Sequence, residues 1–206
     1  MSNNAYLCCS PFERIYPSEA PDFDDRQHYV AMCRDAVPLV WLALFRVEDV
    51  RSDSAEEEEE GGADTAHAAC PVAATEAALR RLHTAEADLE RLFPASRLSQ
   101  HAALLREAIE DWGFPYVTIE LDEIAALHKD ETEFVTEVGT LLRGLESPIE
   151  EARVLECIES VCGIPRGAVI PSPAIFLENR SSLSRKEEML FVSALGTAYS
   201  HSVPWE

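Results

Sequence analysis

The amino-acid sequence predicts an α+β fold, with one domain over residues 1–206 that is mostly helical and has a few short strands. Apolar residues make up 47% of the chain, which is enough to bury a substantial core. Apolar side chains recur at helical spacing through most of the second half, between capping residues and Gly or Pro. Segments rich in β-branched residues are few and short, and a chain of this length fits one domain.

The N-terminal quarter is expected to contain one strand and one buried helix. Residues 5–9 are a strand candidate, and residues 10–28, which contain three prolines, are predicted to be irregular. Pro38 suits the first turn of a helix that runs to about Val47, with Asp35 as a candidate cap. This segment is apolar on every side, so we expect the helix to lie at the centre of the core.

A low-complexity acidic run interrupts the chain after this helix. Glu56 to Glu60 are five consecutive glutamates, and Gly61 and Gly62 follow them. Like charges beside two glycines repel one another and cannot be buried. We therefore predict a mobile acidic loop at 51–72.

Two helices and a strand are predicted after the loop. The first helix spans 79–92 and ends before Pro94, and the second runs from a cap at Ser96 or Ser99 to Trp112. The β-branched content of residues 116–120 predicts a strand, and Asp122 can cap a short helix through Leu127.

The C-terminal third is predicted to contain three more helices. Asp130 caps a helix through Leu145, and a capping box at 147–150 opens a helix through Cys162 whose apolar side includes Ala152. Two prolines in 168–177 predict an extended segment. A second capping box predicts a helix over 184–195, and residues 199–206 are a candidate edge strand.

The charge balance excludes two classes of function. Acidic residues number 38 and basic residues 17, which gives a formal net charge of −21. Binding to nucleic acid or to an anionic membrane surface requires a cationic face, so we expect neither partner. The longest apolar run, 37–45, is too short to span a bilayer, and the N-terminus lacks the features of a signal peptide. We therefore expect a cytoplasmic protein.

Residues that could support catalysis or metal binding are not arranged in recognisable motifs. The six cysteines are irregularly spaced, and without an export signal we expect them to be reduced. The six histidines are scattered singly, which favours surface or core positions over a metal site. The sequence contains no glycine-rich nucleotide loop, nucleophile elbow or zinc-protease motif. We predict a protein that is not an enzyme and has no catalytic residues, metal or cofactor.

The acidic residues between Glu107 and Glu151 form the strongest candidate binding surface. Only Lys129 and Arg143 interrupt the negative series in this stretch, whereas ordinary solvated faces mix both signs. Clustered carboxylates attract a cationic partner and speed its association. The predicted partner-binding residues are Glu120, Asp122, Glu123, Asp130, Glu131, Glu133 and Glu137.

Three segments of the sequence resemble an uncharacterised bacterial family. They are Asn4-Ala-Tyr-Leu-Cys8, the apolar Val37-Pro-Leu-Val-Trp-Leu-Ala-Leu-Phe45, and Val203-Pro-Trp-Glu206. This family is associated with immunity proteins of polymorphic and contact-delivered toxin systems. The resemblance implies a non-enzymatic protein that binds and blocks a cognate toxin protein, and it supplies no catalytic residues.

The charge and the resemblance together predict a cytoplasmic immunity protein, or antitoxin, whose acidic face occludes the basic active site of its toxin. Two alternatives stay open. One is an acidic nucleic-acid mimic that inhibits a DNA-binding protein. The other, weaker alternative is a metal-dependent hydrolase with Asp and Glu ligands; with 38 acidic residues any two could be paired after the fact, so the sequence singles out no catalytic pair.

Overall fold

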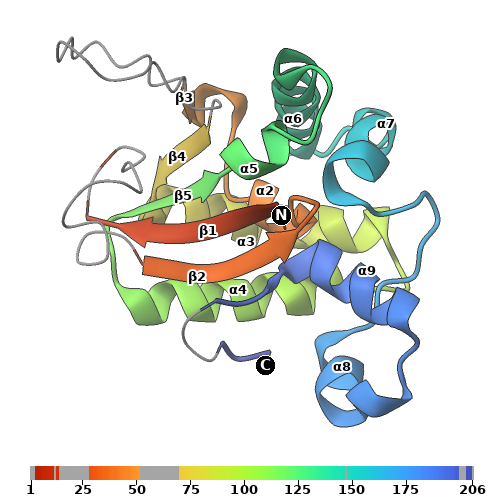
Figure 1. Ribbon diagram of the computed structural model, residues 1–206. Helices are drawn as coiled ribbons and strands as arrows, with labels where there is room; N and C mark the ends of the chain where they lie inside the picture. The colour runs from red at the N-terminus through yellow and green to blue at the C-terminus, as the bar shows by residue number, and fades with distance from the viewer. Residues whose placement is uncertain are drawn as a thin grey trace, which may run out of the picture.

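The computed structural model describes residues 3–11, 13, 28–51, 70–146, 148–199 and 203–205. These residues form a single α+β domain around one antiparallel sheet of six strands, ordered β3-β4-β5-β1-β2-β6 (Figure 1). The predicted fold class is thus confirmed. The strands are β1 (Asn4–Ser10), β2 (His28–Arg34), β3 (Val50–Arg51), β4 (Cys70–Ala74), β5 (Tyr116–Glu120) and β6 (Thr197–Ala198).

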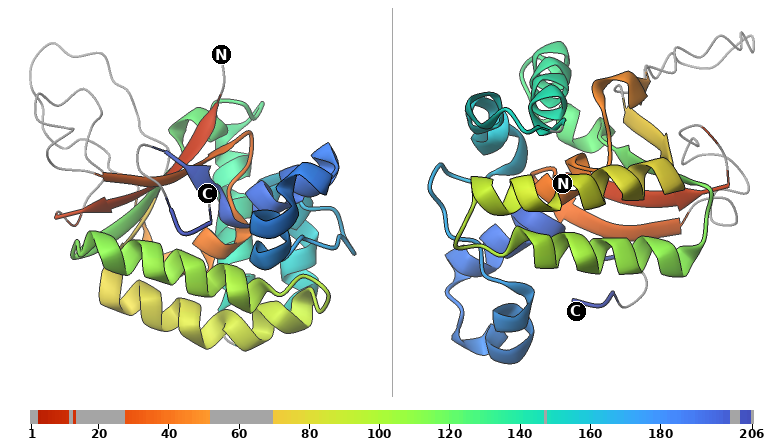
Figure 2. Two further views of the ribbon diagram at one scale, coloured as in Figure 1. Left: turned by 90° about the horizontal axis from the view of Figure 1, so that it is seen from below. Right: turned by 180° about the vertical axis from the view of Figure 1, so that it is seen from behind.

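Eight α-helices surround the sheet within the described residues. The helices α3 and α4 lie side by side across one face of the sheet, and α6 packs on α7 (Figure 2). The helices are α2 (Leu39–Leu42), α3 (Thr75–Leu92), α4 (Leu98–Trp112), α5 (Asp122–Ala125), α6 (Glu131–Leu145), α7 (Glu151–Cys162), α8 (Pro173–Asn179) and α9 (Arg185–Leu195). Two short 3-10 helices, η1 (Val47–Asp49) and η2 (Arg180–Ser182), complete the set.

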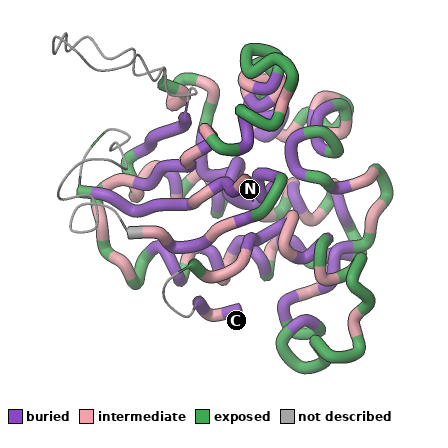
Figure 3. Tube along the Cα trace, viewed as in Figure 1, coloured by how far each residue is buried: buried purple, intermediate pink, exposed green. Residues whose placement is uncertain are grey.

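The centre of the sheet follows the alternation of apolar residues in β1. Ala5, Leu7 and Cys9 are buried in the core, and Leu7 is paired with Ile119 of β5. Both strands that the sequence predicted, at 5–9 and 116–120, are confirmed. In Figure 3 the strands at the centre of the sheet are coloured mostly as buried, whereas α6 carries many exposed positions.

The predicted loop at 51–72 was too long at both ends. Arg51 belongs to β3, and Cys70–Ala74 form β4, whose first four residues are buried. This strand pairs with β3 and β5, and such pairing cannot be inferred from its short run of small side chains. Residues 52–69, with the glutamate run, lie outside the described residues, as does most of the segment 10–28.

The predicted helix at 38–47 is only four residues long in the structure. After α2 the backbone bonds tighten to three-residue spacing, with Leu44 N donating to Trp41 O at 3.0 Å. Asp35 adopts a left-handed conformation at φ 60 and is not the cap; Pro38 occupies that position. The expected burial is confirmed, since every residue from 37 to 45 is buried.

Local capping signals located most of the longer helices. The Asp130 carboxylate accepts from the backbone N of Thr132 at 2.9 Å and Glu133 at 3.2 Å, as predicted, and the box at Ser184 opens α9. The predicted cap of α4 was wrong. Arg97 holds that position, while the Ser96 hydroxyl accepts a bond from the distant Ile170 N at 2.9 Å.

Three C-terminal predictions also need correction. Helix α7 begins at Glu151, and Ala152 is exposed rather than inward. Part of the segment predicted to be extended, 168–177, is helix α8, because Ser172 caps it and the following proline suits its first turn. The edge strand β6 precedes the predicted 199–206, and Pro204 lies in a turn.

Trp41 links α2 to the C-terminal part of the chain. Its side chain is fully buried, and its indole N–H donates to the Leu195 carbonyl over 2.8 Å. We expect Trp41→Ala to lower the free energy of unfolding by about 3–5 kcal/mol. Urea denaturation followed by circular dichroism measures this loss, and Leu127→Ala, at a position 48% exposed, is the control that should change little.

Gly196 packs directly against the Trp41 ring. It has φ +81, and a Cβ at this position would overlap Cζ2 of Trp41. Gly167 also has positive φ, at +72, but a Cβ there meets nothing within 4 Å. We expect Gly196→Ala to reduce the thermal midpoint clearly more than Gly167→Ala, because only the first adds a steric clash to backbone strain. Equal reductions would contradict the close packing of Gly196 on the indole.

Candidate functional site

The seven predicted partner-binding residues lie at the end of β5 and along α5 and α6. Glu120 ends β5, and Asp122 and Glu123 begin α5. The other four, Asp130, Glu131, Glu133 and Glu137, occupy the cap and the first half of α6. The structure therefore divides the predicted site into two groups, and the two groups have different surroundings.

In the first group, two carboxylates bind polar groups of the sheet. Glu123 Oε2 accepts from the Asn4 backbone N at 2.9 Å and from its side-chain amide at 3.4 Å. Glu120 Oε2 accepts from the Tyr29 hydroxyl at 3.4 Å. These bonds fix both carboxylates beside β1 and β2, so Glu120 and Glu123 also serve the local structure.

Three tyrosines pack together next to these carboxylates. The ring centroids of Tyr6 and Tyr29 are 5.0 Å apart, and Tyr199 lies 5.5 Å from the first ring and 4.7 Å from the second. Burial raises the pKa of Tyr6 and of Tyr29, and nearby Glu120 adds to both shifts. The hydroxyls are therefore neutral hydrogen-bonding groups. We call Tyr6, Tyr29, Tyr199, Glu120 and Glu123 the tyrosine–glutamate patch.

Sequence reasoning missed the tyrosines of this patch because they are far apart in the chain. Tyr6 lies on β1, Tyr29 on β2 and Tyr199 directly after β6. Only the neighbouring order of these three strands in the sheet brings the rings together. The one available signal was the outward position of Tyr6 in the alternating strand 5–9.

The second group lies on one helix, where Asp130, Glu133 and Glu137 share a side and Glu131 projects from another. The Asp130 carboxylate is occupied by its capping bonds, while Glu131 and Glu133 are exposed and Glu137 is half-buried toward α7. In the part of the chain described, none of the three glutamates forms an ion pair with a basic side chain. We call Asp130, Glu131, Glu133 and Glu137 the α6 acidic face.

Some acidic residues of α3 are arranged differently, although Glu107 and Glu110 of α4 also form no ion pair among the described residues. Arg106 of α4 reaches Glu86 of α3 with 2.6 Å between Nη1 and Oε1, and Arg91 pairs with Asp88 within α3. Pairing of this kind offsets negative charge locally. The α6 acidic face has no such neutralisation among the described residues, so it retains its attraction for cations.

The cysteines are structural. All six are buried, and none forms a disulfide bond in this structure. Burial raises the pKa of Cys9 and of Cys33 to about 12, so both thiols stay protonated and unreactive at neutral pH. The described residues contain no group of three or more His, Cys, Asp or Glu side chains placed to hold a metal ion.

The comparisons with known proteins add no relatives. No protein-family model, curated protein or solved structure matches this chain. Among the described helices, none combines the length and the apolar character that crossing a membrane requires. The chain is thus described by its own fold, a single α+β domain.

His101 is the one described histidine whose side chain is completely enclosed. Its Nδ1 lies 3.1 Å from the Arg97 carbonyl, and burial lowers its pKa to about 4. Because the unfolded state takes up this proton first as pH falls, the folded state loses stability between about pH 6.5 and 4. At pH 7 the neutral histidine carries no such cost.

We therefore expect His101→Leu to reduce the fall of the unfolding free energy as the pH is lowered from 6.5 to 4. Urea denaturation at intervals across this range measures the slope. His83→Leu, at an exposed position on α3, is the control and should keep the wild-type slope. A slope that His101→Leu leaves unchanged would mean that other groups cause the acid sensitivity.

Proposed function

We propose that this protein is a cytoplasmic immunity protein that binds a cognate bacterial toxin and occludes its active site. The observation that carries the proposal is the α6 acidic face, where Glu131, Glu133 and Glu137 lack ion pairs with described basic residues. Glu133 and Glu137 are four residues apart, and each such like-charge pair costs a helix about 0.2–0.5 kcal/mol. A basic partner surface would remove this repulsion on binding.

The tyrosine–glutamate patch supplies a second kind of contact. Tyrosine is enriched in protein interfaces, where it adds apolar area and a hydrogen-bonding hydroxyl at low entropic cost. Tyr199 is 47% exposed, and its ring packs on two half-buried neighbours, which hold it in place. We infer that long-range attraction comes from the α6 acidic face and short-range recognition from this patch.

The mode of inhibition follows from charge. A toxin that acts on nucleic acid needs a basic cleft for its substrate, and a carboxylate-bearing helix matches the charge of that cleft. Bound there, the helix excludes substrate without performing chemistry itself. This proposal needs no catalytic group, metal or cofactor in the inhibitor.

The first experiment identifies the partner by co-purification with the product of the neighbouring upstream gene. With that partner, we expect the double variant Glu133→Lys, Glu137→Lys to associate at least about tenfold more slowly, because reversing charges removes electrostatic steering. Stopped-flow or surface-based kinetics measures the rate. The wild-type rate should also fall as salt is added, since the Debye length shortens from ~8 Å at physiological ionic strength to ~3 Å at 1 M.

The matched control is Glu178→Lys, Glu188→Lys, which reverses two charges on α8 and α9, outside the predicted surface. This control keeps the net charge change equal but places it away from α6, and it should slow association much less. Equal effects of both double variants, together with salt-insensitive association, would rule out occlusion by the acidic face. If the captured protein is instead a host DNA-binding protein, the nucleic-acid mimic replaces the immunity function.

A further inference from the structure

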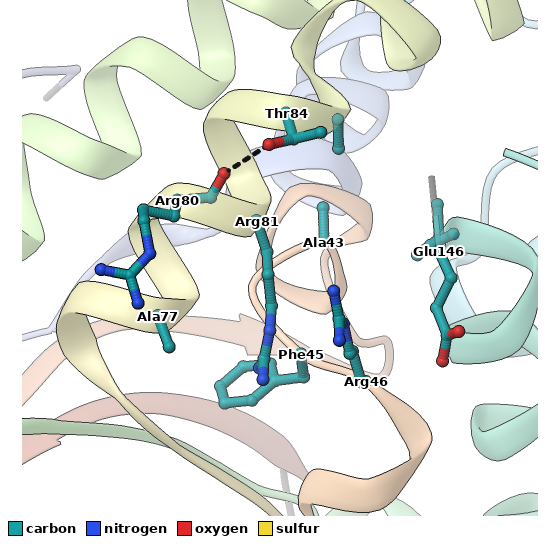
Figure 4. A pocket seen from close by; sticks show the side chains of 10 residues that line it. Ala43, Phe45, Arg46, Ala77, Arg80, Arg81, Thr84 and Glu146 are labelled. Atoms are coloured by element: carbon teal, nitrogen blue, oxygen red, sulfur yellow. Dashed lines mark hydrogen bonds between the residues drawn. The ribbon is translucent and has the colours of Figure 1, made fainter. Parts of the chain in front are cut away.

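A pocket lined by arginines lies on this strongly acidic protein, where the end of α6 approaches α3 and the segment after α2. Its volume is about 570 Å³, within the range of small-molecule sites. Figure 4 shows Arg46, Arg80 and Arg81 around the pocket, with Glu146 on the other side. The complete lining is Ala43, Phe45, Arg46, Ala77, Arg80, Arg81, Thr84, Ala85, Leu145 and Glu146.

Arg81 is fixed by the protein and keeps donors for a ligand. Its Nη1 pairs with the Asp49 carboxylate and lies 3.4 Å from the Leu44 carbonyl. The side chains of Arg81 and Asp49 are only 23% and 15% exposed, so this arrangement is well sheltered. A guanidinium has five N–H donors, and among the described residues only Nη1 of Arg81 is engaged.

Arg46 and Arg80 add further donors from two elements. The Asp49 carboxylate also accepts from the Arg46 backbone N at 2.8 Å, which holds the start of η1 beside Arg81. The guanidinium of Arg46 forms no ion pair with a described residue, and Arg80 uses only Nη1, toward Glu76. The pocket thus presents three guanidinium groups whose donors are largely unused by the described residues.

Glu146 is the one carboxylate among the described residues of the lining. Its oxygen Oε1 is buried, with almost no area open to solvent, so it is not available to a ligand in the pocket. The chemistry that the pocket offers is therefore that of its arginines.

We propose that this pocket binds a small phosphate monoester. Planar guanidinium forks match phosphate oxygens, and a phosphate has enough terminal oxygens to meet Arg46 and Arg81 together. Arg80, whose side chain is 66% exposed, adds positive charge at the edge of the pocket. This site lies apart from the α6 acidic face and does not depend on the proposed function.

Titration calorimetry of the full chain at constant ionic strength tests the proposal. Glycerol 3-phosphate and methyl phosphate both supply the phosphate group, and glycerol supplies only hydroxyls. We expect saturable one-to-one binding of both phosphates and none of glycerol. The absence of saturable binding of either phosphate would overturn the proposal.

Two arginine variants separate a specific site from general charge. Arg46→Ala should weaken glycerol 3-phosphate binding about tenfold or more, because it removes charge-assisted hydrogen bonds. Arg185→Ala removes one exposed cation at the start of α9, outside the pocket, and should leave affinity unchanged. Equal losses in both variants would contradict the site. If the thermal midpoint shows that Arg46→Ala does not fold, Arg46→Gln provides the same comparison.

A third variant tests the sign of the ligand charge. Glu146→Ala removes the one carboxylate of the described lining, so methyl phosphate should bind at least as tightly as to the wild type. Weaker binding to this variant would contradict recognition of an anion by the arginines.

Discussion

The buried indole of Trp41 is the contact on which the arrangement of the helices depends. It donates to Leu195, which lies 154 residues later, and Gly196 packs against its ring. Trp205 in turn donates to the Gly196 carbonyl over 3.3 Å. The two tryptophans therefore bond to the carbonyls of two neighbouring residues, Leu195 and Gly196. A hydrogen-bonded tryptophan fills a large volume without leaving its N–H unsatisfied. The position of α9, and of the strand that follows it, is therefore set by a residue near the other end of the chain.

Elements that carry their own end signals could be predicted from the sequence. Helices α6 and α9 begin at capping residues and have regular apolar stripes, so 130–145 and 184–195 were recognised almost residue by residue. Elements that depend on distant partners could not. Strand β4 exists because β3 and β5 flank it. Helix α2 gives way after four residues to local bonds of three-residue spacing, although the apolar run continues to Phe45.

The candidate site shows the same division. The acidic residues were found because they lie close together in the sequence. Tertiary contacts decide which of them cap a helix, which bond to the sheet and which have no ion pair among the described residues. Asp130 is occupied by the helix start and Glu123 by Asn4, which leaves Glu131 and Glu133 as the exposed carboxylates of the α6 acidic face without such bonds. The tyrosines and the arginine pocket required the strand order and the packing of α6 near α3. The sequence therefore predicted where the acidic residues lie, but not which of their carboxylates are engaged by other groups of the protein.

Both outer strands of the described sheet, β3 and β6, are only two residues long. A long open strand offers a ladder of backbone donors and acceptors to any extended chain, and this is a common route to aggregation and to strand exchange. Strand β6 pairs with β2 only at Ala31 and Met32, so it covers two of the seven residues of β2 on that side. Strand β3 likewise covers only Cys70 and Pro71 of β4. The short outer strands therefore shield only part of the strands behind them, and the net charge of −21 adds repulsion between copies of the molecule.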